Sequence, residues 1–476
     1  MIAATDRTAM ESGTGMEFAG KRVIVMGLGR FGGGIGVTRW LCRQGAKVEV
    51  TDLAQASDLS DSLAALKDLN ITTRLGGHDE STLDRCDLLV VNPGVDKKKS
   101  PFFKAAMARG IPWTSEMNLF MERCPGRIIG VTGTVGKSTT TAMIGAILET
   151  AEKAEGWWHG KSWLGGNIGK SLLDDLPGMS AKDLVVLELS SFQLEDAAQV
   201  RKSPHIALVT NVRDNHLDRH GTLEEYARAK GNIYKYQKDD DWLILPFENG
   251  VEVLPGGWEK HLRVWRFGVD EDTRRVRWAW PGESGRTMEE VEIPLSVPGV
   301  HNVWNAAGAM AVSRILGVAD STALGALAIF NGLPHRLEFV REFGGVKYYN
   351  DSKATTPEAA MTSLRAFDCG VVILLGGSDK GSSFDGLGRL LADRAKAVIC
   401  MGATQERIAE AAERARGAAT VPCVEKVANF AEAVNLARDL AEAGDVVVLS
   451  PACASFDWFK NYEHRGEIFK RTVMGW

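Results

Sequence analysis

The sequence lacks the features of several large classes of protein. Its 7 cysteines include no Cys-x-x-Cys pair and no regular framework, which favours free thiols in a reducing cytoplasm over disulfides or a zinc site. No apolar run is long enough to cross a membrane, and no basic N-terminus precedes an apolar stretch. The 56 Lys and Arg residues are balanced by 61 Asp and Glu residues, so no broad basic surface is expected. We therefore expect a cytoplasmic protein that neither inserts into a membrane nor binds nucleic acid.

A chain of 476 residues is too long for a single core, and its apolar runs fall into three blocks. In each block, short β-type runs alternate with helical stretches, which is typical of α/β domains with parallel sheets. We expect a ragged tail at 1–18 and domains at 19–124, 125–332 and 333–476, with a linker at 121–127. Strands are expected at 22–26, 47–50, 88–91, 184–189, 205–211, 346–350, 371–375, 397–401 and 445–449, with a Trp-rich, strand-like excursion at about 242–298.

The second block opens with a glycine-rich stretch that is typical of a phosphate-binding loop. The apolar pair Ile128-Ile129 precedes Thr132-Gly-Thr-Val-Gly-Lys-Ser138, and a helical pattern follows at 142–148. Glycines let backbone N–H groups turn toward an anion, and the helix N-terminus adds a favourable dipole. The Lys137 amine would reach the β- and γ-phosphates, and the Ser138 hydroxyl could ligate Mg²⁺. The spacing departs from the strict G-x-x-x-x-G-K-[ST] pattern, but the combination predicts use of ATP or GTP.

The first block carries a different glycine pattern. Gly27-Leu-Gly-Arg-Phe-Gly32 directly follows a predicted strand, and Asp52 ends the next one. This arrangement matches the dinucleotide fingerprint, in which a diphosphate lies on a helix N-terminus, so we expect a Rossmann-like domain. The loop Asn92-Pro93-Gly94 ends a third strand and could line the same crevice. A tight packing turn without a ligand is the alternative.

Three polar residues of the second block are candidates for a catalytic site. Glu188 ends an apolar strand, where a buried acid needs a partner such as Mg²⁺. His216 follows another strand, and Lys230 lies on a predicted helix. Each has an ordinary structural explanation when taken singly, most of all the lysine, which could be a solvated helix residue. Only the combination favours a catalytic site.

In the third block, three loops follow predicted strands at 350–357, 375–381 and 450–455. Open α/β sheets bind ligands at the carboxyl ends of their strands, so these loops should converge on one site. Lys353 and Lys380 could meet an anion there. We expect a Rossmann-like domain that binds a small carboxylate.

Four longer motifs extend this interpretation to a family. The segments 187–194 (Leu-Glu-Leu-Ser-Ser-Phe-Gln-Leu), 333–338 (Leu-Pro-His-Arg-Leu-Glu), 350–355 (Asn-Asp-Ser-Lys-Ala-Thr) and 450–455 (Ser-Pro-Ala-Cys-Ala-Ser) resemble those of the Mur ligases in the family's order. The resemblance covers residues 19–474 and is strongest to the branch that adds D-glutamate. It implies an ATP-dependent, amide-forming ligase of peptidoglycan precursor synthesis, and hence of cell-wall biogenesis, cell shape and cell division. The substrates would be UDP-N-acetylmuramoyl-L-alanine and glutamate, joined through an acyl phosphate. We expect a monomer.

The resemblance also assigns roles to residues. It implies catalysis by Lys137, Glu188, His216 and Lys230, and two Mg²⁺ sites held by Ser138, Glu188, His216 and Lys230, the last as a carbamate formed with CO₂. It implies ATP contacts by Gly133, Thr134, Gly136, Lys137, Ser138, Thr139, Asn167, Asn302, Asn305, Arg336 and Asp351. The sugar nucleotide would meet Gly27, Gly29, Arg30, Phe31, Asp52, Asn92, Pro93, Gly94, Ser190 and Gln193. The incoming glutamate would meet Lys353, Thr355, Lys380, Ser455, Phe456 and Tyr462.

The sequence departs from the family pattern at a few positions. Val135 and Thr356 stand where Asn is usual, and Asn215 stands where Asp is usual. The segment 157–163 is unusually rich in aromatic residues. The changes at 135 and 215 would affect turnover rate and metal affinity, and the other two would affect the choice of amino acid.

Three alternatives stay open at the level of sequence. A related ligase that adds L-glutamate would share all the motifs. An NAD-dependent oxidoreductase would use residues 27–32 and Asp52, but would leave the phosphate loop without a role. A nucleotide-binding switch or transport ATPase without ligase activity would use the phosphate loop alone.

Overall fold

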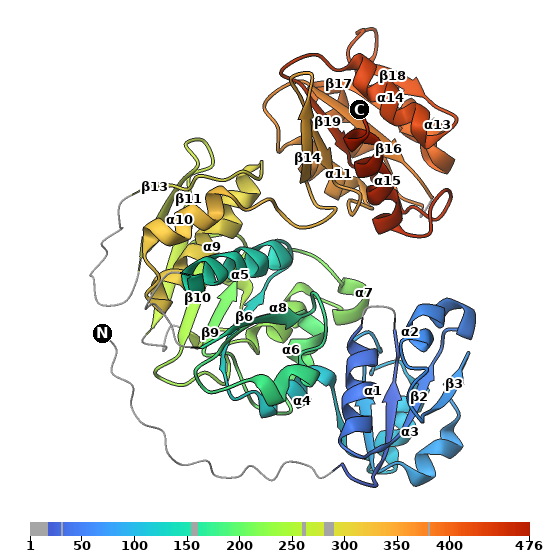
Figure 1. The fold of residues 1–476 in the computed structure, drawn as a ribbon, viewed down its shortest axis with the longest axis vertical. Coiled ribbons are helices and arrows are strands. Elements are labelled where there is room, and N and C mark those ends of the chain that lie inside the picture. Colours follow the sequence, from blue (N-terminus) through green and yellow to red (C-terminus); the bar gives the residue numbers. More distant parts are fainter. Residues whose placement is uncertain (1–17, 30–31, 154–159, 259–262, 280–289, 379–380) are drawn as a thin grey trace. The chain divides into compact units, whose positions relative to one another are not determined.

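The computed structural model describes residues 18–29, 32–153, 160–258, 263–279, 290–378 and 381–476, which form three separate sheets (Figure 1). The first sheet has the order β3-β2-β1-β4-β5, and all its strands are parallel. Apart from the exposed Arg22, its central strands β1 and β4 are buried apolar runs, as expected for a sheet covered on both faces. The elements are β1 (Arg22–Met26), α1 (Gly33–Arg43), β2 (Lys47–Asp52), α2 (Ser60–Ala64), β3 (Thr72–Leu75), β4 (Leu88–Val91), α3 (Pro101–Ala108), β5 (Trp113–Thr114) and α4 (Glu116–Arg123).

The second sheet has eight strands in the order β13-β12-β11-β10-β9-β6-β8-β7. The pairs from β7 to β11 are parallel, and β13 is antiparallel to β12. The strands are β6 (Arg127–Thr132), β7 (Ser162–Gly166), β8 (Leu184–Glu188), β9 (Ile206–Val209), β10 (Trp242–Pro246), β11 (Val264–Val269), β12 (Arg275–Ala279) and β13 (Val291–Glu292). The helices are α5 (Lys137–Lys153), α6 (Ser191–Ala197), α7 (Leu217–His220), α8 (Leu223–Gly231), α9 (Val300–Leu316) and α10 (Asp320–Ala328).

The third sheet has six strands in the order β14-β15-β19-β16-β17-β18. All its pairs are parallel except β14 with β15. The strands are β14 (Glu338–Phe343), β15 (Val346–Asn350), β16 (Val371–Gly376), β17 (Ala395–Met401), β18 (Cys423–Lys426) and β19 (Val446–Leu449). The helices are α11 (Pro357–Leu364), α12 (Asp385–Arg394), α13 (Gln405–Arg416), α14 (Phe430–Leu440) and α15 (Tyr462–Met474).

The expected α/β class is confirmed, but two expectations need correction. The second and third sheets are mixed rather than wholly parallel, because β13 and β14 run antiparallel to their neighbours. In the third sheet, Gly344 and Gly345 both have positive φ (61° and 77°) and close a tight hairpin between β14 and β15. The linker expected at 121–127 is shorter, because α4 extends to Arg123 and buries Met121.

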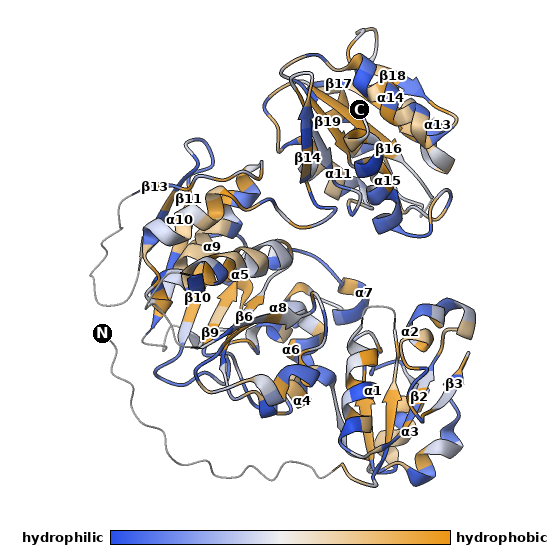
Figure 2. Cartoon of the chain, viewed as in Figure 1, coloured by the Kyte–Doolittle hydropathy of each residue, from blue (hydrophilic) through white to orange (hydrophobic). Residues whose placement is uncertain are grey.

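By its contacts, the chain divides into two compact units. The first comprises the described residues within Met1–Lys137, Ala151–Phe267 and Trp278–Thr287, and the second comprises those within Ser138–Thr150, Gly268–Arg277 and Met288–Trp476. In both units the central strands are hydrophobic and the polar residues gather on the helices and loops (Figure 2). All seven cysteines are free thiols. Among the described residues, no helix is both long and apolar enough to cross a membrane.

Candidate active site

The predicted phosphate loop joins β6 to α5, as expected. Gly133 has a φ of 151°, and a Cβ atom there would lie 1.9 Å from the Thr210 hydroxyl at the end of β9. Only glycine fits this position, because β9 approaches the loop so closely. The Thr134 N–H donates to the Asn211 carbonyl at 3.0 Å, which fixes the loop against the same strand end.

The departure at Val135 has a structural explanation. The side-chain amide of Asn211 accepts from the Val135 N–H at 3.0 Å and donates to the Val135 carbonyl at 3.0 Å. The Thr210 hydroxyl donates to the same carbonyl at 2.7 Å. The loop is therefore held through the peptide groups of residue 135, and the valine side chain is 54% exposed. The shape of the loop does not depend on that side chain.

Two lysine amines meet at one backbone carbonyl of this loop. The Lys137 amine donates to the Gly133 carbonyl at 3.0 Å and to the Thr134 carbonyl at 2.9 Å. The Lys230 amine, from α8, donates to the same Gly133 carbonyl at 2.7 Å. Lys230 is 1% exposed, and its amine lies 4.4 Å from the centre of the Tyr226 ring. Lys230 is therefore a buried helix residue whose amine contacts the loop, and not the solvated helix residue that its position alone suggested.

The surroundings of Lys230 disfavour its charged form. Burial lowers its pKa well below the usual value, and the nearby Lys137 charge lowers the pKa further. Among the described residues, no acid forms an ion pair with its amine. A lowered pKa favours the uncharged, nucleophilic form of a lysine amine.

Glu188 ends β8 beside this loop and is 2% exposed. Its Oε1 atom accepts from the Asn167 side chain at 3.0 Å, whereas its Oε2 atom has no hydrogen-bond partner within the described part of the chain. The Asn167 N–H also donates to the Glu188 carbonyl at 2.8 Å. A buried carboxylate oxygen without a donor fits a cation ligand.

His216 precedes α7 in a left-handed conformation, with a φ of 53°. Its N–H donates to the Asn215 side chain at 3.0 Å, a bond that an aspartate in that position would also accept. Desolvation lowers the pKa of His216, so the ring is neutral at pH 7. Among the described residues, no three His, Cys, Asp or Glu side chains gather closely enough to hold a metal ion.

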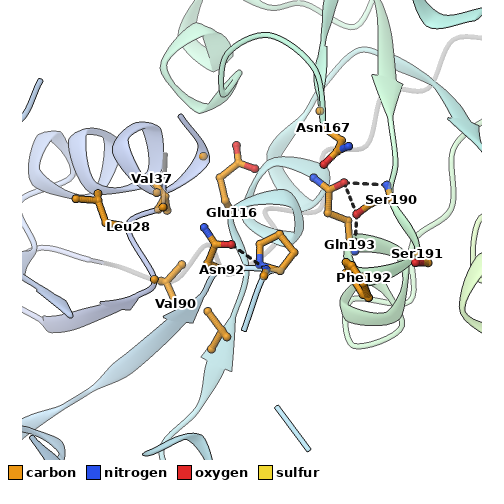
Figure 3. Close-up of a pocket in the computed structure, with 18 of the residues that line it drawn as sticks. Leu28, Val37, Val90, Asn92, Glu116, Asn167, Ser190, Ser191, Phe192 and Gln193 are labelled. Carbon is orange, nitrogen blue, oxygen red and sulfur yellow. Dashed lines mark hydrogen bonds between the residues drawn. The ribbon is translucent and has the colours of Figure 1, made fainter. Parts of the chain in front are cut away.

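One cavity of about 340 Å³ in the first unit brings Lys137, His216 and Lys230 together with the glycine loop (Figure 3). Glu188 is not among its lining residues, although its partner Asn167 is. Figure 3 shows Asn92, Glu116, Asn167 and Gln193 around it. Of the residues expected to bind the sugar nucleotide or to act on phosphate, it is lined by Gly27, Gly29, Asn92, Pro93, Gly94, Lys137, Asn167, Ser190, Gln193, His216 and Lys230. The cavity therefore joins the predicted diphosphate loop to the predicted phosphate-transfer groups.

The Asp52 carboxylate supports the glycine loop from behind. It accepts from the N–H groups of Leu28 (2.8 Å), Gly29 (3.1 Å) and Ala54 (2.9 Å). These bonds occupy the acid on which a nicotinamide-dependent activity would depend. Arg30 and Phe31 lie outside the described residues. Ser190 and Gln193 form a capping box at the start of α6, in which the Gln193 side chain accepts from the Ser190 N–H at 2.9 Å.

Two residues of this cavity region were not found from the sequence. Arg219, on α7, donates to the carbonyls of Gly94 (2.9 Å), Pro93 (3.2 Å) and Val95, and so holds the 92–95 loop. Glu116 lines the cavity and accepts from the Ser171 hydroxyl at 2.5 Å, and burial raises its pKa to about 7. Arg219 lies three residues after His216, which was the available signal. Glu116 follows the N-cap Ser115 and resembles an ordinary helix-start acid.

In the second unit, Asn302 and Asn305, which are both expected to contact ATP, are linked to α5 by hydrogen bonds. The Thr140 hydroxyl donates to Asn305 at 3.2 Å, and Asn305 donates to Asn302 at 3.2 Å. Both asparagines are buried on α9. The early turns of α5, which also carry Ser138 and Thr139, are thus connected to the asparagine pair.

The three loops of the third sheet also converge, as expected from the strand ends. Asp351 is buried, and its carboxylate accepts from the hydroxyls of Ser363 and Ser450 (2.7 Å) and from the Leu337 N–H (3.1 Å). Burial raises its pKa to about 6. It therefore ties the loop after β15 to the loop after β19.

The remaining residues expected to hold glutamate or ATP surround these loops. The Lys353 amine lies 5.7 Å from the Tyr462 ring, whereas Ser455 is buried and Phe456 is 67% exposed. Burial raises the pKa of Tyr462 to about 12. Thr355 lies two residues after Lys353, and its N–H donates to the Lys353 carbonyl at 2.9 Å. Arg336 precedes β14, and Lys380 lies outside the described residues.

Comparisons with known proteins assign these features to one family. Three family models match in order: a Mur ligase MurD-like N-terminal domain at residues 21–115, a Mur ligase middle domain at 131–313 and a Mur ligase glutamate ligase domain at 335–453. The UDP-N-acetylmuramoylalanine--D-glutamate ligase of Roseiflexus sp. (strain RS-1) is 40% identical over 96% of this chain and 99% of that protein. The chain belongs to the Mur ligase family.

Other Mur ligases agree with this assignment. A protein of the same description from Symbiobacterium thermophilum is 39% identical over 95% of this chain and 98% of that protein. A solved UDP-N-acetylmuramate-alanine ligase from Thermotoga maritima has the same fold, with a TM-score of 0.59 and 19% identity over 95% of this chain and 99% of that chain. The Mur ligase assignment accounts for three α/β domains in one chain.

The departure at Thr356 from the usual Mur ligase sequence is also conservative in structure. Its hydroxyl caps α11 by accepting from the Ala359 N–H at 3.4 Å, a role that the more usual Asn fills equally well. In the aromatic segment at 157–163, residues 157–159 lie outside the described residues, whereas the indole N–H of Trp163 donates to Asp183 at 2.8 Å.

Proposed function

We propose that this protein is an ATP-dependent ligase that adds D-glutamate to UDP-N-acetylmuramoyl-L-alanine in peptidoglycan precursor synthesis. The observation that carries the proposal is that one cavity is lined by the 27–29 and 92–94 loops and also by Lys137 and Lys230. A sugar nucleotide with its diphosphate at the first loops would extend its carboxylate toward the phosphate-transfer groups. The names of the 40% and 39% identical relatives support D-glutamate over L-glutamate.

The chemistry requires that a carboxylate attack the γ-phosphate of ATP. This transfer forms an acyl phosphate and releases ADP. The amine of glutamate then attacks the acyl carbon, displaces phosphate and loses a proton to make the amide. Phosphoryl transfer of this kind needs positioning and charge neutralisation more than covalent help. The N–H groups of Gly133, Gly136 and Ser138, together with the Lys137 amine, would neutralise the transferred phosphoryl group, because Asn211 already accepts from those of Thr134 and Val135. Thr134 and Thr139 would also contact ATP.

The residues present fit magnesium ions, although the described side chains alone do not complete a site. Glu188 offers a buried oxygen without a donor, and His216 offers a neutral ring. In its uncharged form, which the lowered pKa favours, the Lys230 amine can add CO₂ and release a proton, which gives a carbamate with a carboxylate-like charge. Bound there, Mg²⁺ would neutralise charge on the phosphates. Ser138, Glu188, His216 and carbamylated Lys230 would hold it.

The other substrate contacts follow from the same assignment. The domains at 19–124, 125–332 and 333–476 would bind the sugar nucleotide, ATP and glutamate, respectively. Asn167, Asn302, Asn305, Arg336 and Asp351 would contact ATP. Gly27, Gly29, Arg30, Phe31, Asp52, Asn92, Pro93, Gly94, Ser190 and Gln193 would serve the sugar nucleotide. Lys353, Thr355, Lys380, Ser455, Phe456 and Tyr462 would serve glutamate. We further propose a cytoplasmic monomer, consistent with seven free thiols.

An end-point assay tests the proposal. The protein is incubated with ATP, Mg²⁺ and UDP-N-acetylmuramoyl-L-alanine, and with D-glutamate or L-glutamate in separate tubes. A new nucleotide-linked dipeptide should be detected by mass with D-glutamate only, and phosphate release should require all substrates. Product with L-glutamate alone would move the chain to the L-adding branch. Phosphate release that ignores glutamate would contradict the proposal.

A further inference from the structure

Arg465 is a buried arginine on α15 that no prediction from the sequence included. Its side chain is 1% exposed. Its Nε atom donates to the Ser352 hydroxyl at 2.9 Å, and one Nη atom donates to the carbonyls of Ser352 (2.9 Å) and Cys453 (3.1 Å). The other Nη atom donates to the Ala454 carbonyl at 3.4 Å. The guanidinium group is thus surrounded by neutral oxygen atoms.

These partners belong to the loops that end neighbouring strands of the third sheet. Ser352 follows β15, and Cys453 and Ala454 follow β19. Gly377 follows β16, and a Cβ atom there would lie 3.2 Å from a guanidinium nitrogen of Arg465. Arg465 therefore lies beneath all three loops that the sequence predicted to form an anion site.

Within the described part of the chain, no ion pair neutralises the positive charge of Arg465, and Asp457 acts on it only at longer range. Among the described residues, no carboxylate lies within ion-pair distance of it. Burial lowers its pKa to about 10, so the group stays charged at neutral pH. A buried charge without a counter-ion costs stability, which a structural role alone does not require, because neutral donors could satisfy the same carbonyls. The arrangement fits an anion that arrives from outside the chain.

We propose that Arg465 is a positioning residue whose buried charge, acting through the three loops, makes this site select an amino acid with two carboxylates. The proposal rests on the ligase function proposed above. Its loops carry Lys353, Thr355 and Ser455, which would touch the substrate directly. Arg465 would not touch the substrate itself. It would hold these loops in place through its hydrogen bonds, and its buried positive charge would be only weakly screened by salt in solution.

Two substitutions separate the charge from the hydrogen bonds. Arg465→Lys keeps the charge but loses the guanidinium geometry, whereas Arg465→Gln keeps a donor but loses the charge. We expect Arg465→Gln to raise the KM for D-glutamate about tenfold more than Arg465→Lys does, because a unit charge acts over several ångströms through a low-dielectric interior. The KM values for ATP and for UDP-N-acetylmuramoyl-L-alanine should stay unchanged in both variants. Equal KM values for D-glutamate in the two variants would overturn the proposal in favour of loop geometry alone.

A further variant, Asp457→Asn, leaves Arg465 in place. It tests the role of the charge even if thermal unfolding shows that the two Arg465 variants are unstable. Asp457 is exposed, and its charge raises the pKa of Arg465. Its carboxylate accepts from the Ala403 N–H at 3.1 Å, a bond that Asn can retain. Asp457→Asn should lower the KM for D-glutamate about twofold by removing a competing negative charge. The matched control Arg471→Gln, on the exposed face of the same helix, should change nothing.

An unchanged KM in Asp457→Asn would overturn the role of the charge. A wild-type protein that forms no amide with D-glutamate would instead overturn the proposed function, so the two failures are distinguishable.

Discussion

Replacing Arg219 by Gln should weaken binding of the sugar nucleotide without affecting ATP. The guanidinium donates to three successive carbonyls, those of Pro93, Gly94 and Val95, and its carbon lies 4.6 Å from the centre of the Phe192 ring. A hydrogen bond to a charged group contributes about 1.5–3 kcal/mol, and a cation–π contact about 0.5–2 kcal/mol. Because the Arg219 side chain is 16% exposed, water can replace part of these contacts in the variant. We therefore expect the substitution to remove about 3 kcal/mol of the free energy that holds the 92–95 loop.

That loss corresponds to a Kd for UDP-N-acetylmuramoyl-L-alanine about 100-fold higher, if all of it is used to order the 92–95 loop on binding. Isothermal titration calorimetry without ATP measures it directly. Arg219→Lys, which offers one point donor, should fall between the wild type and Arg219→Gln. Arg228→Gln on α8 is the matched control, because its exposed pair with Glu225 contributes little. A Kd for Arg219→Gln equal to that of the wild type would refute the idea that Arg219 shapes the sugar-nucleotide loop.

Three further predictions concern neighbouring groups. Lys230→Ala should abolish most phosphate release, and bicarbonate or short carboxylates such as formate should restore part of it; near wild-type turnover would remove Lys230 from the metal site. Asn305→Ala breaks the link to Thr140 and should weaken ATP binding about tenfold in a fluorescent-nucleotide titration, leaving UDP-sugar binding intact. Glu116 binds a proton more tightly in the folded state, where its pKa is about 7, than in the unfolded state, so its burial costs stability progressively as pH rises from about 4.5 to 7. Glu116→Gln should therefore unfold at the same temperature as the wild type near pH 4.5 and at a higher one at pH 8, by up to about 3 kcal/mol in stability; identical pH profiles would contradict this.

The strands and the main loops could be predicted because their signals are local. Apolar runs bounded by Gly, Asn or Asp gave β1, β4, β8 and β19 nearly to the residue. The phosphate loop was equally accessible, since its glycines are demanded by positive φ and by close approach of β9. The antiparallel β14 was missed although the Gly344-Gly345 turn was visible, because the parallel pattern of the other strands dominated the interpretation.

The supporting residues of the site could not be predicted, because their roles depend on contacts distant in sequence. Arg465 reaches Ser352 across 113 residues, and Arg219 reaches Gly94 across 125. Asp52 was expected to face a ligand, yet its oxygens accept from the N–H groups of its own glycine loop. Such hydrogen bonds depend on tertiary packing, and a local sequence pattern contains no information about tertiary packing.

The hydrogen bonds that hold the loop through the peptide groups of Val135 have a practical consequence for binding measurements. Because Asn211 and Thr210 form hydrogen bonds with its main chain, the exposed side chain can be replaced by a reporter group without a change in the conformation of the loop. A small fluorophore attached there through an introduced thiol would lie on the loop at which we propose that ATP binds. It would make each binding event visible in real time, in a loop whose geometry is set elsewhere.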